Sequence, residues 1–326
     1  MNNILVTGGA GYIGSHACKA LKERGFTPIA FDNLSTGWED AVKYGPFVFG
    51  DLTKLTDIEP AFQKYRPVAV MHFAARSQVG ESILNPGAYW QNNVIGSLNL
   101  LRTCIRENCL NVVFSSTCAT YGEHDNLILS ENSVQTPMNS YGASKLAVEN
   151  MLKNFSESDD IRFIIFRYFN VAGADKSAEI GEFHMPETHL IPLILDAMIN
   201  DKQFTIHGTD YSTPDGTCVR DYVHVSDLIE AHILGLERLL RGEISDIFNL
   251  GTGKGFSVRE VIDAVSAVTG KSIQVFAGDR RRGDCSKLVS GSAKAKAVLG
   301  WSPENSSLHK MIEDAWRWHK HGHYRS

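Results

Sequence analysis

Short apolar runs alternate with longer amphipathic stretches through the first half of the chain. The runs are continuously apolar and are bounded by glycine or polar residues, as is typical of buried parallel strands. They predict strands at 3–7, 27–32, 47–49, 68–72, 112–116 and 162–169. The stretches between them show a helical period and predict helices at 12–24, 55–65, 89–106 and 141–155. Strands that alternate with helices indicate βαβ units with right-handed crossovers. The predicted fold class is therefore α/β, with a doubly wound parallel sheet.

The regular alternation of strand and helix patterns ends after residue 172. Residues 173–187 and 210–216 are rich in glycine, proline and acidic residues and predict loops. Later apolar patterns predict helices at 225–240, 257–269 and 308–318. We therefore expect two domains, 1–172 and a smaller α/β domain of 173–326, with segments near 223–250 returning to the first.

Composition narrows the function class. The chain has 326 residues, 43% of them hydrophobic, and 32 basic residues against 37 acidic ones, which give a net charge of −5. A nucleic-acid-binding protein usually has a basic surplus, so we expect no nucleic-acid partner. No apolar run is long enough to span a bilayer, and the first residues lack the basic region of a signal peptide, so we expect no membrane association. The six cysteines are scattered without a C-x-x-C pair, which favours free thiols in the cytoplasm and no metal site.

A glycine-rich turn follows the first predicted strand. Gly8, Gly11 and Gly14 form G-x-x-G-x-x-G, a spacing variant of the dinucleotide-binding fingerprint. Glycine lets backbone N–H groups approach a pyrophosphate, and the helix N-terminus adds partial positive charge. Asp32 ends the second strand, where a carboxylate accepts hydrogen bonds from an adenosine ribose and repels a 2′-phosphate, so NAD is favoured over NADP. Asp51 follows the third strand and is expected at the adenine edge.

A second constellation carries the candidate chemistry. Tyr141 and Lys145 are four residues apart in a helical segment, so their side chains share a face. A phenol has a reference pKa of about 10, and a nearby ammonium lowers that pKa and suits the phenol to remove a hydroxyl proton. Ser115, Ser116 and Thr117 end the fifth predicted strand, where parallel sheets open into a ligand crevice. We therefore expect an alcohol-oxidising site beside a nicotinamide.

The chain resembles the extended short-chain dehydrogenase/reductase superfamily and, within it, the UDP-sugar 4-epimerases. The resemblance runs essentially end to end, and it rests on VTGGAGYIGSH at 6–16, FDNL at 31–34, HFAA at 72–75, VGES at 79–82, NNV at 92–94, SSTCATYG at 115–122, SYGASK at 140–145, RYFNVAGA at 167–174, DGTCVRDYVHV at 215–225, FNLGTG at 248–253 and RRRGD at 280–284. The glycine turn and the Tyr-Lys pair are shared across the superfamily, whereas 215–225 and the RYFN run are more specific to epimerases. The resemblance implies a Rossmann-type first domain that binds NAD and a second domain that binds a UDP-sugar.

The resemblance also implies a role for each site residue. The catalytic residues would be Tyr141 as the base, Lys145 as its electrostatic partner and Thr117 as the hydroxyl partner. The implied cofactor-binding residues are Gly8, Gly11, Tyr12, Ile13, Gly14, Asp32, Asn33, Asp51, Leu52, Phe73, Ala74, Ala75, Asn92, Ser115, Tyr141, Lys145 and Tyr168. The implied substrate-binding residues are Thr117, Tyr141, Asn170, His189, Leu190, Thr205, His207, Arg220, Tyr222, Arg281 and Asp284.

The implied reaction inverts the C4 alcohol of the sugar through a transient 4-keto sugar. NAD takes up the hydride and returns it to the other face, so it is not consumed. Arg220 and Arg281 would hold the diphosphate bidentately while the sugar turns. Relatives pair through helices that match 89–106 and 141–155, so we expect a homodimer. Burial of those faces against the sheet of the same subunit is the alternative.

Three departures from the family pattern affect these roles. Ser77, beside Arg76, stands where some members have a lysine near the nicotinamide. His189-Leu190, preceded by Thr188, stands where some members have a uridine-side Asn-Asn-Leu, and Leu288 stands near the place of a bulky tyrosine that narrows the sugar pocket. Leu288 leaves open an N-acetylated sugar.

Other functions stay open at this stage. The alternatives on the same scaffold are a 4-epimerase of UDP-N-acetylglucosamine, UDP-arabinose or UDP-glucuronate, and a 4,6-dehydratase. A dehydratase would carry Asp-Glu after Thr117, where this chain has Cys118 and Ala119. A nucleotide-sensing module without catalysis is disfavoured by the intact Tyr141 and Lys145.

Overall fold

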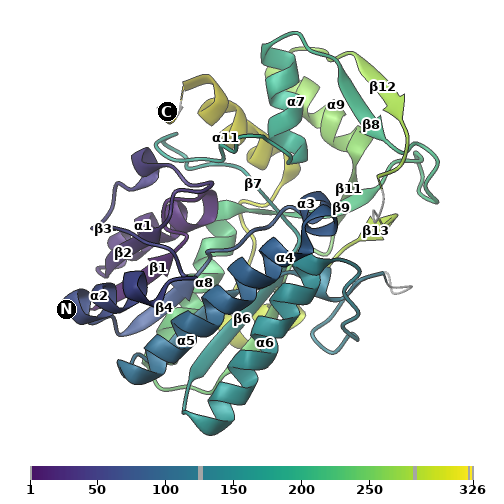
Figure 1. The fold of residues 1–326 in the computed structure, drawn as a ribbon. Coiled ribbons are helices and arrows are strands. Elements are labelled where there is room, and N and C mark those ends of the chain that lie inside the picture. Colours follow the sequence, from purple (N-terminus) through teal and green to yellow (C-terminus); the bar gives the residue numbers. More distant parts are fainter. Residues whose placement is uncertain (1, 124–127, 282–284, 322–323, 325–326) are drawn as a thin grey trace.

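A seven-stranded parallel sheet forms the centre of the first domain (Figure 1). The computed structural model describes residues 2–123, 128–281, 285–321 and 324. The strand order is β10-β6-β5-β4-β1-β2-β3. These strands are β1 (Asn3–Thr7), β2 (Thr27–Asp32), β3 (Phe47–Phe49), β4 (Ala69–His72), β5 (Asn111–Ser115), β6 (Arg162–Tyr168) and β10 (Asp246–Leu250). The predicted α/β class with a doubly wound parallel sheet is confirmed.

Helices cover both faces of this sheet because alternate strand residues point to opposite sides. Ile4 and Val6 pack in one core with α1 (Tyr12–Glu23) and α8 (Val225–Leu240). Leu5 packs in the other core with α2 (Leu55–Tyr65), α5 (Gly96–Arg106) and α6 (Ser140–Ser158). Figure 1 shows α5 and α6 running along the same face. The carboxyl ends of all seven strands therefore meet at one edge, beneath the second domain.

The second domain is built from short strands and three packed helices. Strand β9 (Val219–His224) pairs with β7 (Asn170–Ala172), β11 (Gly255–Ser257) and β13 (Lys287–Leu288), and β8 (Phe204–His207) pairs with β12 (Val275–Gly278). Helices α7 (Leu190–Ile199), α9 (Val258–Thr269) and α11 (Leu308–His321) share a third apolar core. The remaining helical elements are η1 (Glu39–Ala41), α3 (Val79–Leu84), α4 (Pro86–Tyr89), η2 (Trp90–Ile95), η3 (Cys118–Thr120) and α10 (Ala293–Leu299).

Most of the predicted elements lie within a residue or two of those found. The clearest difference lies in the predicted helix 89–106, which is divided into α4, the π-helical η2 and α5. The predicted loops 173–187 and 210–216 contain no helix or strand. After α8 the chain returns to the first sheet, where β10 lies beside β6, whereas the domain boundary near 172 stays a prediction. Within the described residues, no helix has both the length and the apolar character needed to cross a bilayer.

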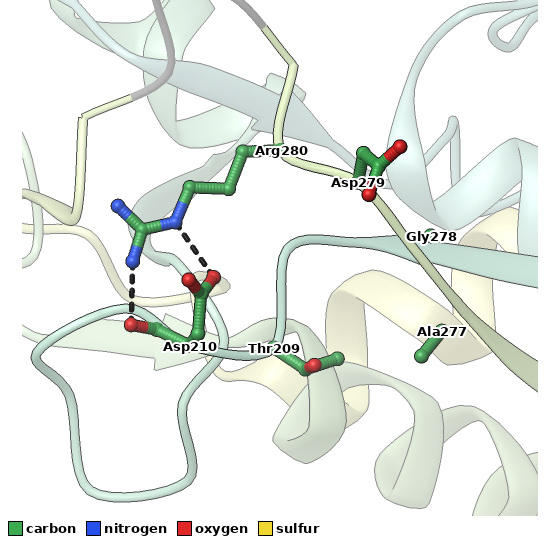
Figure 2. A pocket seen from close by; sticks show the side chains of 6 residues that line it. All are labelled: Thr209, Asp210, Ala277, Gly278, Asp279 and Arg280. Carbon is green, nitrogen blue, oxygen red and sulfur yellow. Dashed lines mark hydrogen bonds and ion pairs between the residues drawn. The ribbon is translucent and has the colours of Figure 1, made fainter.

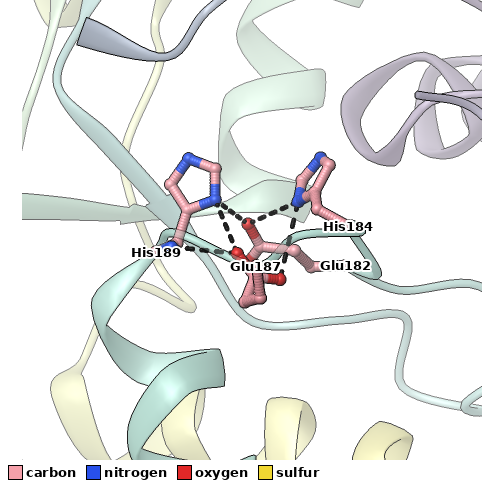
Figure 3. A group of neighbouring side chains, drawn as sticks. All are labelled: Glu182, His184, Glu187 and His189. Carbon is pink, nitrogen blue, oxygen red and sulfur yellow. Dashed lines mark hydrogen bonds and ion pairs between the residues drawn. The ribbon is translucent and has the colours of Figure 1, made fainter. Parts of the chain in front are cut away.

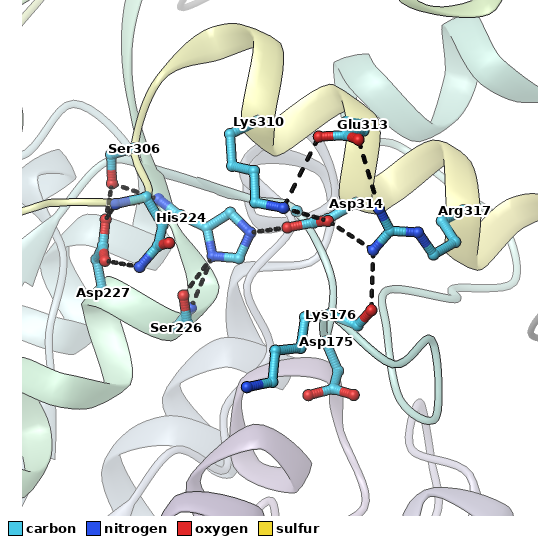
Figure 4. A network of polar contacts seen from close by, with 12 residues as sticks. Asp175, Lys176, His224, Ser226, Asp227, Ser306, Lys310, Glu313, Asp314 and Arg317 are labelled. Carbon is cyan, nitrogen blue, oxygen red and sulfur yellow. Dashed lines mark hydrogen bonds and ion pairs between the residues drawn. The ribbon is translucent and has the colours of Figure 1, made fainter.

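A polar network joins α11 to the ends of β9 and α8 (Figure 4). The buried His224 ring accepts at Nδ1 from the backbone N–H of Ser226 at 3.0 Å, and its Nε2 lies 3.3 Å from Asp314 of α11. Asp227, at the start of α8, accepts hydrogen bonds from Asn305 and Ser306. The first domain and the C-terminal helix are therefore linked by buried polar contacts.

A buried ion pair fixes α6 against the sheet. Arg167 of β6 donates from Nε to Glu149 Oε1 at 2.9 Å and from Nη2 to Oε2 at 2.6 Å. The Arg167 side chain is 2% exposed and that of Glu149 is fully buried. Ser116 and Gln135 also donate to Glu149, and Arg167 donates to the Tyr121 hydroxyl at 2.8 Å. Because Glu149 lies one turn after Lys145, this pair sets the position of the Tyr141–Lys145 face.

Breaking this pair from one side is predicted to destabilise the protein strongly. Arg167→Met leaves the Glu149 carboxylate buried without its cation, so we expect the free energy of unfolding to fall by about 3–5 kcal/mol in urea denaturation. The double variant Arg167→Met/Glu149→Leu removes both charges and should lose less. Arg241→Met, at an exposed pair with Glu243, is the matched control and should change stability by no more than about 0.5 kcal/mol. Equal losses in the single and double variants would contradict this account.

Candidate active site

The glycine turn after β1 forms a cradle that larger residues would block. Gly8 has φ of +73°, and a Cβ there would lie 2.7 Å from the backbone N of Ala74. A Cβ on Gly14 would lie 2.0 Å from the carbonyl oxygen of Gly8. Gly11 caps α1 without a side-chain hydrogen bond, so the first N–H groups of that helix face the turn. This cradle fits the pyrophosphate of a dinucleotide.

Asp32 lies at the end of β2, directly beside the cradle. It is 9% exposed, and its carboxylate accepts hydrogen bonds from the backbone N–H groups of Ala10 at 3.1 Å and Leu34 at 2.8 Å. Burial raises the pKa of this carboxyl despite those donors. Asn33 donates to Asp51 at 3.3 Å, so the residues predicted at the adenosine end lie together.

The other predicted cofactor residues surround the same edge of the sheet. Tyr12 donates its hydroxyl to the carbonyl of Gly173 at 2.6 Å, which connects the cradle to the loop after β7. Phe73 and Ala74 follow β4, and both of their N–H groups donate to the carbonyl of Thr7. The rest are Ile13 in the core on the α1 face, Leu52 packed on Gly96, Ala75 in the segment after β4, and Asn92 in η2.

Tyr141, Lys145 and Thr117 converge at the carboxyl end of β5. The Thr117 hydroxyl hydrogen-bonds the phenol of Tyr141. Lys145 is 4% exposed, and its Nζ donates to the carbonyl of Ser115 at 2.8 Å. The Ser115 hydroxyl hydrogen-bonds the hydroxyl of Tyr168. The predicted catalytic residues and two predicted cofactor residues therefore form one cluster.

The pKa values in the cluster differ from the expectation that Lys145 lowers the pKa of Tyr141. Burial raises the pKa of Tyr141 to about 12, and the hydrogen bond from Thr117 acts in the opposite direction. Burial lowers the pKa of Lys145 to about 7, against the attraction of Glu149. Desolvation therefore dominates the pKa values of both groups.

The predicted substrate residues of β7 and β9 lie side by side. Asn170 is paired in register with Tyr222. Arg220 donates to the carbonyls of Val219 and Cys285 at 2.9 Å each. Burial raises the pKa of the Tyr222 phenol, and the positive charges of Arg220 and Arg281 act in the opposite direction. Leu288 is paired with Arg220 across β9 and β13. The predicted contact of Asp284 lies outside the described residues.

Thr205 and His207 are exposed on β8, next to an open pocket of about 440 Å³. Figure 2 shows Arg280 at this pocket, held by Asp210 through its Nε at 2.7 Å. The Arg280 guanidinium also lies over the Tyr211 ring, 4.2 Å from its centre. Arg280 is therefore engaged on the outer side of this loop, whereas Arg281 lies near Tyr222.

His189 lies in a group of four side chains with Glu182, His184 and Glu187 (Figure 3). It caps α7, whose first residue is the predicted Leu190. One ligand atom from each of the four side chains lies within 4.8 Å of the others, so the group has the geometry to hold a metal ion. The carboxylates, however, raise the pKa of both histidines against the effect of burial, to about 9 for His184 and about 10 for His189. Because a metal needs neutral imidazoles, protons compete strongly for this group.

Sequence reasoning missed two structural features of the site. Asn93, next to the predicted Asn92, is buried in η2. Its side chain accepts from the backbone N–H of Arg76 at 2.8 Å and donates to the Arg76 carbonyl and to the Ser144 hydroxyl, each at 3.0 Å. Only the π-helical turn decides which of the two asparagines points inward. Arg76, the neighbour of Ser77, pairs with Glu81 at 2.7 Å.

Comparisons with known proteins agree with this geometry. Residues 4–251 match the NAD dependent epimerase/dehydratase family. The UDP-glucose 4-epimerase of Rhizobium meliloti is 46% identical over 98% of this chain and 97% of its own length. The UDP-glucose 4-epimerase of Brucella ovis in complex with NAD is 44% identical, with a TM-score of 0.94 over 97% of this chain and 98% of that one. The enzyme of Bifidobacterium longum in complex with NAD⁺ and UDP is 32% identical, with a TM-score of 0.92 over 98% of both chains.

The glycine cradle, the buried Asp32 and the Tyr141–Lys145 cluster are thus found in a chain whose relatives match it from end to end. The protein belongs to the NAD dependent epimerase/dehydratase family.

Proposed function

We propose that the protein is a UDP-glucose 4-epimerase, which interconverts UDP-glucose and UDP-galactose with bound NAD. The observation that carries the proposal is the convergence of Tyr141, Thr117 and Lys145 beside the glycine cradle. The near full-length similarity to UDP-glucose 4-epimerases supports it. A dehydratase is disfavoured because the residues after Thr117 are Cys118 and Ala119.

Different residues of the chain would bind the cofactor and transfer the proton. Gly8, Gly11 and Gly14 would admit the pyrophosphate of NAD, and Asp32 would bind its adenosine ribose. Bound NAD would supply a reversible acceptor for the C4 hydride of the sugar. Tyr141 removes the proton of the C4 hydroxyl and gives it back.

Tight binding of the nucleotide part of the substrate allows the sugar to rotate between the two hydride transfers. Arg220 and Arg281 would hold the diphosphate, with Tyr222 near the uridine. Asn170, in register with Tyr222, would contact the sugar side. Leu288, which is half-buried opposite Arg220, leaves room for an N-acetylated sugar as a second substrate.

Homodimer formation is a further part of the proposal. Leu101, Val148 and Leu152 lie on the two helical runs that are expected to pair, but they are buried in the subunit's own core. Trp90 and Ile95 of η2 are 43% and 40% exposed, so the same helical run still offers an apolar surface. These two side chains are the better candidates for a subunit contact.

Turnover should depend on the Tyr141 phenol. Wild-type protein is expected to convert UDP-galactose to UDP-glucose, and Tyr141→Phe should lower kcat by about 10²–10⁴-fold because the general base is lost. Product identification after separate incubation with UDP-galactose and UDP-N-acetylgalactosamine measures both activity and sugar range. Tyr65→Phe on α2 is the matched control and should keep full activity. An unchanged rate in Tyr141→Phe rules out this residue as the base.

The pH profile should report the Thr117 hydrogen bond. Because this bond lowers the pKa of Tyr141, Thr117→Ala should move the midpoint of the rising limb of log(kcat/KM) to higher pH, by up to about one unit. Thr117→Ser keeps the hydroxyl and should restore the wild-type midpoint. If Ala and Ser variants share one profile, the hydroxyl does not tune the phenol.

Association can be measured by sedimentation velocity at micromolar concentration. The wild-type protein is expected to sediment as a dimer, and Trp90→Glu as a monomer, because a charge would be buried in the apolar contact. Phe49→Glu, at a 68% exposed residue on the edge strand β3, is the control and should remain dimeric. A monomeric wild-type protein would end the homodimer proposal.

A further inference from the structure

Two glutamates and two histidines form an alternating ring of contacts in the loop before α7. His189 Nδ1 lies 2.8 Å from Glu182 Oε1 and 3.1 Å from Glu187 Oε1. His184 Nδ1 lies 3.5 Å from Glu182 Oε1 and 3.6 Å from Glu187 Oε2. Each histidine therefore faces both carboxylates through the same ring atom.

The two rings present the same nitrogen to the carboxylates. Figure 3 shows the inner nitrogen of each ring turned to the carboxylates and the outer nitrogen of each turned away, both on the same side of the group. The ring centres are 5.2 Å apart. The ring planes are tilted by 51°. A protonated imidazole donates from both nitrogens, so the two outer N–H groups form a pair of donors on one side of the group.

The glutamates are held in place independently of the histidine rings. The Glu182 side chain is 6% exposed, and its backbone carbonyl accepts from the indole of Trp318 at 2.8 Å. Glu187 accepts at Oε1 from the backbone N–H groups of Thr188 at 2.7 Å and His189 at 2.9 Å. The Glu187 carboxylate is therefore held by the backbone, and the Glu182 side chain projects from an anchored and buried position.

Charge balance favours protonated rings. Two carboxylates face two imidazoles, so double protonation makes the group neutral as a whole while leaving positive N–H groups on its outer side. The Glu carboxylates raise the pKa of His184 to about 9 and of His189 to about 10, although burial opposes both. The titratable groups from other elements that are close to these glutamates are Tyr12 of α1 and Tyr324, both neutral phenols with pKa values raised by burial.

The group lies between the cofactor cradle and the start of α7. Phe183, between Glu182 and His184, packs on Trp38 with ring centres 5.1 Å apart. Trp38 in turn donates its backbone N–H to Ala10 of the glycine turn at 2.9 Å. His189 caps α7, whose N-terminus adds partial positive charge. The group is therefore connected through Phe183 and Trp38 to the turn that is expected to hold a pyrophosphate, and it stands at the positive end of α7.

We propose that Glu182 and Glu187 are positioning residues that keep His184 and His189 protonated as paired donors to a diphosphate group. The proposal rests on the proposed UDP-sugar function and adds to it a role for His184 and for the two carboxylates. The diphosphate is that of the UDP-sugar or that of NAD, which share the same chemistry.

The sign of the pH dependence follows from the carboxylates. With both present, the rings stay charged through neutral pH and the affinity for a diphosphate is flat. Removing one carboxylate lowers the histidine pKa toward or below its reference value of about 6.5, so the rings lose their charge as pH rises through the neutral range. The affinity of such a variant should therefore fall with rising pH, whereas the wild-type affinity should not.

Calorimetry on the NAD-loaded protein tests this, with UDP and uridine as probes at pH 6.0 and pH 8.5. Glu187→Gln and Glu182→Gln should bind UDP about tenfold more weakly than wild type at pH 8.5, the loss expected for one charge-assisted hydrogen bond. At pH 6.0 the difference should shrink to about twofold, and uridine, which lacks phosphate, should show no pH-dependent difference. Glu179→Gln, in the same loop but paired with Lys19, is the matched control.

Retention of NAD at the same two pH values identifies the source of the diphosphate. Loss of UDP affinity with NAD retained assigns the histidines to the substrate, and NAD release at pH 8.5 in the Gln variants assigns them to the cofactor. An equal loss for UDP and uridine at both pH values means a purely structural role and overturns the proposal, as does wild-type behaviour in both variants. UDP-galactose turnover by the wild-type protein, measured separately, shows whether the proposed function itself fails.

Discussion

The position of the reactive helix depends on one ion pair that is closed off from water. Arg167 and Glu149 are joined through two hydrogen bonds, and Ser116, Gln135 and Tyr121 satisfy their remaining groups. A buried pair of this kind contributes little net stability compared with apolar packing, but it penalises every arrangement that separates the charges. It therefore fixes the rotation and height of α6 on the sheet, and with them the places of Tyr141 and Lys145.

The same burial that fixes the helix also sets the chemistry. Lys145 and Tyr141 are both desolvated, which favours the neutral form of each and moves their pKa values apart, to about 7 and about 12. Transfer of a proton from this phenol to this amine therefore costs more than their reference pKa values suggest. The hydrogen bond from the Thr117 hydroxyl favours the phenolate of Tyr141 and so partly offsets the effect of burial on this residue.

The sequence alone allows accurate prediction where local chemistry decides the structure. The glycine spacing and the apolar runs place the cradle, Asp32 and the strand ends, because a tight turn admits only glycine and buried strands need continuous apolar residues. Patterns could not separate Asn92 from Asn93, because the answer depends on a π-helical turn that shifts the register of the helix. Patterns also could not reveal that His189 faces two carboxylates. Residues 182–189 come together because the loop folds back on itself, and an irregular loop has no periodic sequence pattern. Leu101 and Leu152 have helical spacing on an apolar face, and only packing shows that this face covers the subunit's own sheet.

The loop that carries Glu182 and His184 is anchored by residues made much later in the chain. Trp318 donates to the Glu182 carbonyl, and Tyr324 contacts Gly181 through both the N–H and the carbonyl of that glycine. During synthesis on the ribosome, the cradle strands emerge first and can pair as soon as β4 is available, whereas this loop lacks its anchors until residue 324 has left the exit tunnel. The nucleotide cradle can therefore assemble on a nascent chain well before the neighbouring loop acquires its final shape.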